Sequence, residues 1–160
     1  CGPDGALYIA DWVNGWGTKN YGRVWKLDVD EQNDDLAQER METQALMALD
    51  YTDLEISKLS ELLAYSDMRI RQKAQFELAK RGEQEPLLET IAQTDNQLAR
   101  IHGIWGIGQI AAKDKGVAGA LIPYLQDSDP EIIAQTAKVL GDLNYEEAGN
   151  EYVALLKNAQ

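Results

Sequence analysis

A pattern of helix caps and small side chains occurs three times after residue 66 and constrains the fold of this 160-residue chain more than any other feature. Asp67, Asn96 and Asp129 occupy equivalent places, 29 and 33 residues apart, and all are residue types that begin helices. The residue three places after each cap is apolar. The residue seven places after the cap is small, and the residue eleven places after it is leucine-like. The residues at these places are Ile70, Ala99 and Ile132, then Ala74, Gly103 and Thr136, then Leu78, Ile107 and Leu140. Small side chains allow close helix approach, so the pattern predicts stacked helix pairs that share one core.

The helix pairs are expected from residue 53 to the end of the chain. Thr52 and Glu55 fit a capping box that would open the first helix, and Gly82 is suited to end the second. The apolar face of the first helix would hold Ile56, Leu59, Leu62 and Leu63. The later helices are predicted at residues 68–81, 86–93, 97–112, 117–126, 130–143 and 146–157. The last helix lacks the partner helix that would complete its pair, which leaves Tyr152, Leu155 and Leu156 without their expected partner. We therefore expect this end to be frayed or covered by a neighbouring molecule.

Residues 1–30 have a different composition, with five of the 13 glycines and three of the four tryptophans. Short apolar or alternating runs at 6–10 and 22–29 predict two strands, joined by a loop from Asp11 to Tyr21. Residues 31–52 begin as an acidic linker and continue into a helix from Leu36 to Leu49. The sequence therefore predicts a mainly α protein. It would divide into a hairpin (1–30), a linker with a helix (31–52) and an α-α superhelix of three to four helix pairs (53–160).

Charge and hydropathy exclude two classes of partner. Residues 1–30 carry three basic and four acidic side chains, so the remaining 130 residues hold −11 of the formal net charge of −12. That field repels phosphate backbones, and we expect no nucleic-acid partner. No apolar run approaches the ~20 residues that span a bilayer, so we expect no direct membrane insertion. The chain begins inside a turn-and-strand pattern, and we expect it to be a piece of a longer protein.

Three patterns that could carry chemistry have simpler interpretations. Residues 106–111 match G-x-G-x-x-A but lie within a predicted helix, where close packing explains the glycines better than a nucleotide does. Acidic and amide side chains from Asp28 to Glu39 match a calcium-loop spacing, but the turn glycine and the incoming helix are missing. Cys1 lacks an adjacent base that would activate it. We therefore expect no catalytic, cofactor-binding or metal-binding residue.

His102 and Trp105 are the remaining candidates for function in the repeat region. His102 is the only histidine, so a packed or surface role is favoured over a metal site. Trp105 could anchor a protein partner, with core packing the favoured alternative. Together with Arg71 and Arg100, they are the candidate partner-binding residues.

The repeat register resembles the HEAT-repeat family, and Arg71 and Arg100, one place after the apolar position, carry that resemblance. The third repeat departs from it, because Ile133 stands where the family often has arginine. The resemblance covers about two thirds of the chain and implies a HEAT-like solenoid. HEAT arrays bind many unlike partners, so the resemblance implies little about function.

A second resemblance lies at the N-terminus. Residues 2–12 and 22–27 resemble the closing blade of a six-bladed β-propeller, as in sugar and sorbosone dehydrogenases of the quinoprotein class. One bacterial group, described as membrane-bound dehydrogenases, joins such a propeller to HEAT repeats and a cytochrome c domain, and residues 71–78 and 100–105 resemble its HEAT region. The resemblance implies a periplasmic or cell-surface parent protein with haem c and a quinone. The haem-attachment signature Cys-x-x-Cys-His is absent here, as is most of the propeller, so neither cofactor is expected in this chain.

These observations lead to two main expectations. The first is a non-catalytic HEAT interaction or spacer module of a larger, exported dehydrogenase-like protein, which would dock the neighbouring domains of its own chain. The alternative is a free-standing HEAT adaptor that binds a protein or peptide on its concave face. A DNA-binding HEAT protein would need a basic groove, and the charge of the repeat region disfavours it.

Overall fold

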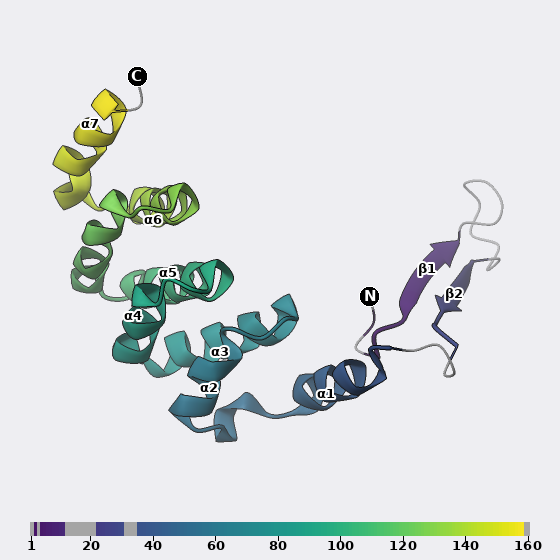
Figure 1. Ribbon diagram of the computed structural model, residues 1–160. Helices are drawn as coiled ribbons and strands as arrows, with labels where there is room; N and C mark the ends of the chain where they lie inside the picture. Colours follow the sequence, from purple (N-terminus) through teal and green to yellow (C-terminus); the bar gives the residue numbers. More distant parts are fainter. Residues whose placement is uncertain (1, 3, 12–21, 31–34, 159–160) are drawn as a thin grey trace. The chain divides into compact units, whose positions relative to one another are not determined.

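The computed structural model describes residues 2, 4–11, 22–30 and 35–158. They form two compact units that divide between Leu49 and Asp50 (Figure 1). The described residues are mainly helical, with one antiparallel pair of strands near the N-terminus. Cys1 and most of the loop expected after Asp11 lie outside the described residues.

The first unit contains the hairpin and one helix. Strand β1 (Leu7–Asp11) pairs antiparallel with β2 (Arg23–Leu27), and Ile9 lies opposite Trp25. The two predicted strands are thus confirmed. Helix α1 (Ala37–Ala48) follows them. Every side chain of both strands is exposed, so the two strands contribute no buried side chain.

Charged side chains organise the first unit. The Asp4 carboxylate accepts a hydrogen bond from the Tyr8 hydroxyl (2.8 Å) and pairs with the Lys26 ammonium (2.9 Å). Lys26 also pairs with Asp28 (3.0 Å), which in turn pairs with Arg40 of α1. The Lys26 contact is the main reason that the pKa values of both Asp4 and Asp28 lie below their ordinary range. Because Arg40 also donates to the Asp4 carbonyl (3.1 Å), these charges join the strand ends to α1.

The second unit forms two layers of helices, and the chain alternates between them (Figure 1). One layer contains α3 (Met68–Arg81), α5 (Gln97–Ala111) and α6 (Pro130–Asp142), and the other contains α2 (Ile56–Leu62), α4 (Gln84–Ala92) and the 3₁₀ segment η3 (Lys115–Gln126). Helix α5 packs against α3 and α6 in its own layer and against α4 and η3 in the other. The short segment η2 (Tyr51–Asp53) precedes these layers, and η4 (Glu146–Ala148) and α7 (Gly149–Asn158) follow them.

The three predicted caps are confirmed. The side chains of Asp67, Asn96 and Asp129 each accept a backbone N–H bond two or three residues further on, at 2.8, 3.0 and 2.9 Å respectively. Each bond satisfies a donor that the first helical turn would otherwise leave unpaired. Gly82 ends α3 with φ of 81°, a left-handed conformation that suits glycine.

Close helix packing also explains the glycines of α5. A Cβ atom on Gly103 would lie 2.7 Å from Ile91 Cγ1 and 3.0 Å from the Leu87 carbonyl oxygen, both in α4. On Gly108 it would lie 2.7 Å from Val139 Cγ1 in α6. The register positions expected to be apolar or leucine-like are buried, with Ile70, Leu78, Ile107, Ile132 and Leu140 all fully so.

The predicted capping box at the start of α2 is wrong. Helix α2 begins at Ile56, and its N-cap residue, Glu55, makes no side-chain cap bond. Thr52 lies in η2, and the Asp50 carboxylate accepts bonds from both its backbone N–H (2.9 Å) and its hydroxyl (2.7 Å). The threonine hydroxyl therefore stabilises the turn before α2 and does not cap the helix. Ile56 remains partly exposed at 38%, while Leu59, Leu62 and Leu63 are buried as expected.

Two details near the C-terminus also differ from the sequence expectations. The segment predicted as a helix at 117–126 has 3₁₀ geometry and begins at Lys115. Pro123, which lacks a backbone donor, lies inside it. Tyr152 is not left unpartnered, because its hydroxyl donates to the Ala137 carbonyl of α6 (2.9 Å). Leu156 is exposed at 72%, as expected for a side chain without a packing partner.

Candidate interaction groove

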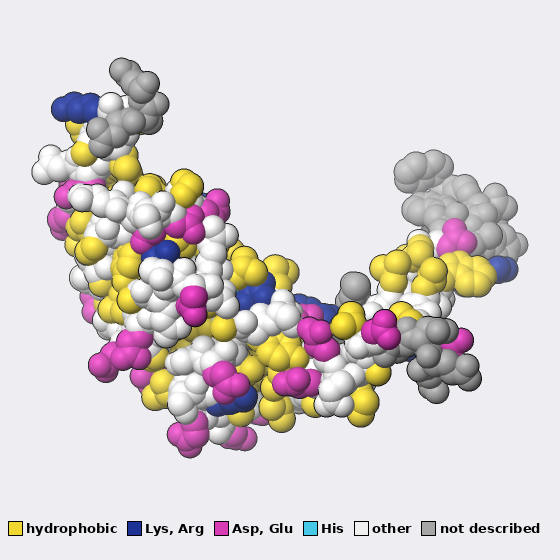
Figure 2. Space-filling model, in the orientation of Figure 1, with side chains coloured by type: hydrophobic (Ala, Val, Ile, Leu, Met, Phe, Trp, Pro, Cys, Tyr) yellow, Lys and Arg dark blue, Asp and Glu magenta, His cyan; other side chains and the backbone are white. Residues whose placement is uncertain are grey.

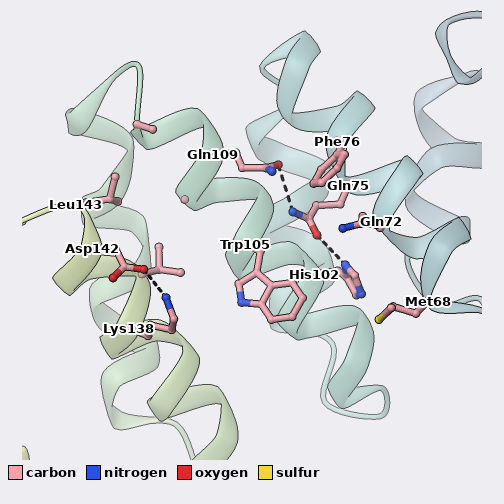
Figure 3. Close-up of a pocket in the computed structure, with 13 residues that line it drawn as sticks. Met68, Gln72, Gln75, Phe76, His102, Trp105, Gln109, Lys138, Asp142 and Leu143 are labelled. Atoms are coloured by element: carbon pink, nitrogen blue, oxygen red, sulfur yellow. Dashed lines mark hydrogen bonds and ion pairs between the residues drawn. The ribbon is translucent and has the colours of Figure 1, made fainter. Parts of the chain in front are cut away.

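A groove of about 520 Å³ crosses the layer formed by α3, α5 and α6 (Figure 3). We refer to it as the α3–α5–α6 groove. Its lining residues are Met68, Gln72, Gln75, Phe76, His102, Trp105, Gly108, Gln109, Ala112, Lys138, Val139, Asp142 and Leu143. All three cap-bearing helices contribute to it, so the repeat pattern that builds the core also positions the groove.

Large apolar side chains are exposed in the groove. Met68, Phe76 and Trp105 are 61%, 48% and 38% exposed, although each is a type that usually lies inside a protein. Phe76 and Trp105 project into the same space from the adjacent helices α3 and α5 (Figure 3). Exposed aromatic side chains in a hollow are typical of protein-binding surfaces, where they act as anchors.

Side-chain amides link the helices beneath these apolar groups. The Gln75 amide of α3 donates to Gln109 of α5 (3.2 Å), and the Trp105 indole N–H donates to Gln135 of α6 (2.9 Å). The three helices are therefore held in register on the groove side. A floor fixed in this way limits the rearrangement that binding would require.

His102 lies under the groove as a neutral, packed histidine. It is 4% exposed, and its Nδ1 lies 2.7 Å from Gln75 Oε1, which can only accept, so Nδ1 carries the hydrogen. Its ring meets Trp105 edge-on at 5.1 Å between centroids. Burial, assisted by the charge of Arg71, lowers the pKa of His102 to about 4. The imidazole is thus uncharged at neutral pH and supports the position of Trp105.

A smaller cavity of about 260 Å³ adjoins the groove and shares Phe76 and Gln109 with it. Ala79, Lys80 and Lys113 complete its lining. The two hollows therefore form a continuous surface along α3 and α5, apolar at Phe76 and basic at the C-terminal ends of the helices.

Arg71 and Arg100, two of the candidate partner-binding residues, are buried and used within the protein. Arg71 donates to the carbonyls of Tyr65 and Ser66, both at 2.7 Å, and Arg100 donates to the Ile91 carbonyl (2.7 Å). They are only 6% and 4% exposed, so neither guanidinium is available on the surface. Of the four candidates, only His102 and Trp105 line the groove.

Arg100 also forms the most buried ion pair of the second unit's described residues, with Asp127 at 2.5 Å. The hydrogen bond from Arg100 is the main cause that lowers the pKa of Asp127. The arginines that carry the HEAT resemblance therefore fix the loops between helices.

Most of the groove residues were not predicted from the sequence, although the repeat register contains a signal for them. Nine residues after the caps stand Phe76, Trp105 and Lys138, all exposed in the groove. The register predicts burial only at its third, seventh and eleventh places. Aromatic side chains at an unburied place indicate a surface with a binding role.

The other patterns singled out in the sequence do not form sites among the described residues. Gly106 to Ala111 lie inside α5, so they do not form a loop between a strand and a helix. Asp28 of the calcium-like spacing pairs with Lys26 and Arg40, and residues 31–34 lie outside the described residues. No group of three or more metal-ligating side chains occurs within the described ranges. The same residues include no helix that is both long and apolar enough to cross a membrane.

Comparison of the chain with protein-family models, with curated proteins and with solved structures finds no match. The arguments about its function therefore rest on its own residues.

Proposed function

We propose that residues 50–160 form a short HEAT-like solenoid that acts as a non-catalytic protein-interaction module. The observation that carries the proposal is the α3–α5–α6 groove, in which Phe76 and Trp105 are both exposed and a hydrogen bond between Gln75 and Gln109 links their helices. The solenoid assignment is supported by the three matching caps and by the alternation of helices between two layers.

Selection of short random peptides displayed on phage tests the proposal. We expect peptides enriched on the wild-type protein to lose affinity about tenfold for Trp105→Ala, since removal of an anchor in a binding hollow has effects of this size. Leu98→Ala is the matched control, because Leu98 also lies on α5 and is 50% exposed but does not line the groove. Enriched peptides that bind both variants as well as the wild type would contradict the proposal.

We also propose that this module belongs to a larger exported protein of the propeller, HEAT and cytochrome c type, where it spaces or docks the neighbouring domains. The resemblance of residues 2–12 and 22–27 to a propeller blade supports this context. The exposure of every side chain of the two strands supports it too, since two strands alone are marginal in water. We expect the gene to encode a propeller before this segment and a Cys-x-x-Cys-His signature after it. Other flanking sequences would favour the free-standing adaptor.

The same context predicts that the chain itself has no catalytic activity. We expect no dehydrogenase turnover when it is assayed alone with sugars and a quinone acceptor. Turnover that depended on a residue between 53 and 160 would show that the module is not a scaffold.

A further inference from the structure

The charge of the α3–α5–α6 groove and its adjoining cavity is opposite to that of the chain. Their lining residues include Lys80, Lys113 and Lys138 but only one acidic side chain, Asp142, which gives 3 − 1 = +2. The whole chain carries −12. On the face shown in Figure 2, acidic side chains are spread over the helices of residues 50–160. A local positive surface on an acidic protein favours a negatively charged ligand at that surface.

Two of these lysines are available to a ligand. Lys113 is exposed and forms no ion pair within the part of the chain that the structure describes. Lys80 is 65% exposed and lies 3.3 Å from Glu77, a contact weaker than the 2.9 Å bond that Glu77 accepts from Arg81. Both lysines line the cavity that continues the groove beside Phe76. Lys138, by contrast, already pairs with Asp142.

Amide groups suited to a peptide backbone lie near the two aromatic side chains of the groove. Gln72 is exposed, and its side chain forms no hydrogen bond with any other described residue. Gln109 accepts from Gln75 through its oxygen, which leaves its amino group free to donate. A free amide next to an aromatic side chain can bind a peptide carbonyl while the aromatic ring contacts the neighbouring side chain.

We propose that the groove binds an acidic segment of another protein. An apolar side chain of that segment lies between Phe76 and Trp105, and a carboxylate lies between Lys80 and Lys113. The inference rests on the proposed function, because it assigns the ligand chemistry of the same groove.

The size of the basic surface favours a short acidic peptide over a nucleic acid. Charges in water are screened over about 8 Å at physiological ionic strength, so a carboxylate beside Lys80 and Lys113 experiences mainly those two groups. A nucleic-acid strand would carry further phosphates beyond the groove, into the field of a chain with a net charge of −12. The chemistry therefore matches a segment with one or a few acidic residues next to a large apolar one.

The same displayed library of short random peptides tests the inference when it is selected in parallel on the wild type and on the double variant Lys80→Gln/Lys113→Gln. We expect the wild-type pool to be enriched in Asp and Glu relative to the input, and the double-variant pool to lose that enrichment. For a synthetic peptide from the wild-type pool, we expect affinity to fall about threefold per lysine and about tenfold for both, because exposed ion pairs are individually weak. Lys58→Gln is the control, since Lys58 lies on α2, outside the groove.

The outcomes separate this inference from the proposed function. Pools that are neutral or basic, with binding that is lost in Trp105→Ala but unchanged in the double lysine variant, would overturn the acidic ligand and leave the interaction groove intact. Pools whose binding does not depend on Trp105 would overturn both. Acidic peptides that bind Lys58→Gln as well as the wild type and lose affinity only with the groove lysines support the inference.

Discussion

Residues 1–49 and residues 50–160 are stabilised in different ways. In the first unit every strand side chain is exposed, and the described apolar residues that are buried are Ala6 and Leu46. Its contacts are largely between charges, such as Lys26 with Asp4 and Arg40 with Asp28. In the second unit, apolar side chains from seven helical segments are completely buried.

The difference predicts which unit is stable when it is separated from the other. Exposed ion pairs contribute at most about 1 kcal/mol each, which is small beside the conformational entropy that a hairpin loses on folding. A buried leucine or isoleucine contributes about 1.5–3 kcal/mol, and the second unit has many of them. We therefore expect independent stability only from residues 50–160.

The largest effect should come from separating the units. Residues 50–160 produced alone should unfold in one cooperative transition, while residues 1–49 alone should show none, because the shorter piece lacks a core. Circular dichroism during thermal unfolding of each piece measures this directly. A sharp transition in residues 1–49, or its absence in residues 50–160, would mean that apolar burial does not determine which unit is stable on its own.

The next largest effect should come from the buried ion pair of the second unit. Arg100→Met leaves the Asp127 carboxylate and the Ile91 carbonyl without their guanidinium partner. We expect the free energy of unfolding in urea to fall by about 3 kcal/mol. Lys138→Met, which breaks a pair with 65% exposure on both sides, should cost less than about 0.5 kcal/mol. Similar losses in both variants would contradict the assignment of Arg100 to the interior.

A smaller effect should appear as acid sensitivity of the second unit. Burial lowers the pKa of His102 to about 4. Between that pH and about 6.5, the His102 imidazole therefore binds a proton in the unfolded chain but stays neutral in the folded chain. The contribution of His102 is therefore fully present above pH about 6.5 and is lost as the pH falls towards about 4. We expect about 2 kcal/mol less stability at pH about 5 than at about 7.5.

His102→Gln provides the control for this acid effect, since the chain has no other histidine. The variant should show a weaker pH dependence over the same range, with the difference from the wild type equal to the histidine contribution. Urea unfolding at both pH values measures it. Identical pH dependence in the two proteins would place His102 in contact with water.

The sequence predicts the parts of the second unit that depend on local geometry. The caps at Asp67, Asn96 and Asp129 were predictable because each bond closes within three residues of the side chain. The small residues of α5 were predictable because they recur in the register. The capping box at Thr52 failed because Asp50, outside the motif, accepts both of its hydrogen bonds.

The groove depends on packing between repeats, which a single repeat does not specify. Arg100 has the sequence signature of a surface cation, and only its reach to Asp127, 27 residues away, makes it an interior group. Trp105 was expected to favour the core, yet it lines the groove, while Gly103 and Gly106 are the residues of α5 that lie close to α4. The Lys80 and Lys113 surface depends in the same way on the packing of α3 beside α5.

The link from Arg100 to Asp127 restricts which repeats can be neighbours when such a chain gains or loses repeats by gene duplication. Asp127 lies two residues before the third cap, and Thr94 holds the equivalent place before the second. The repeat that carries Arg100 therefore needs a carboxylate in the repeat after it. Arg71 makes no such demand, because it donates to the carbonyls of Tyr65 and Ser66 in its own repeat, and the third repeat has Ile133 at the arginine position. Deleting the repeat that contains Asp127 would leave the buried Arg100 guanidinium without its carboxylate partner. The repeats that hold Arg100 and Asp127 must therefore stay adjacent, or an evolutionary rearrangement must change both positions together.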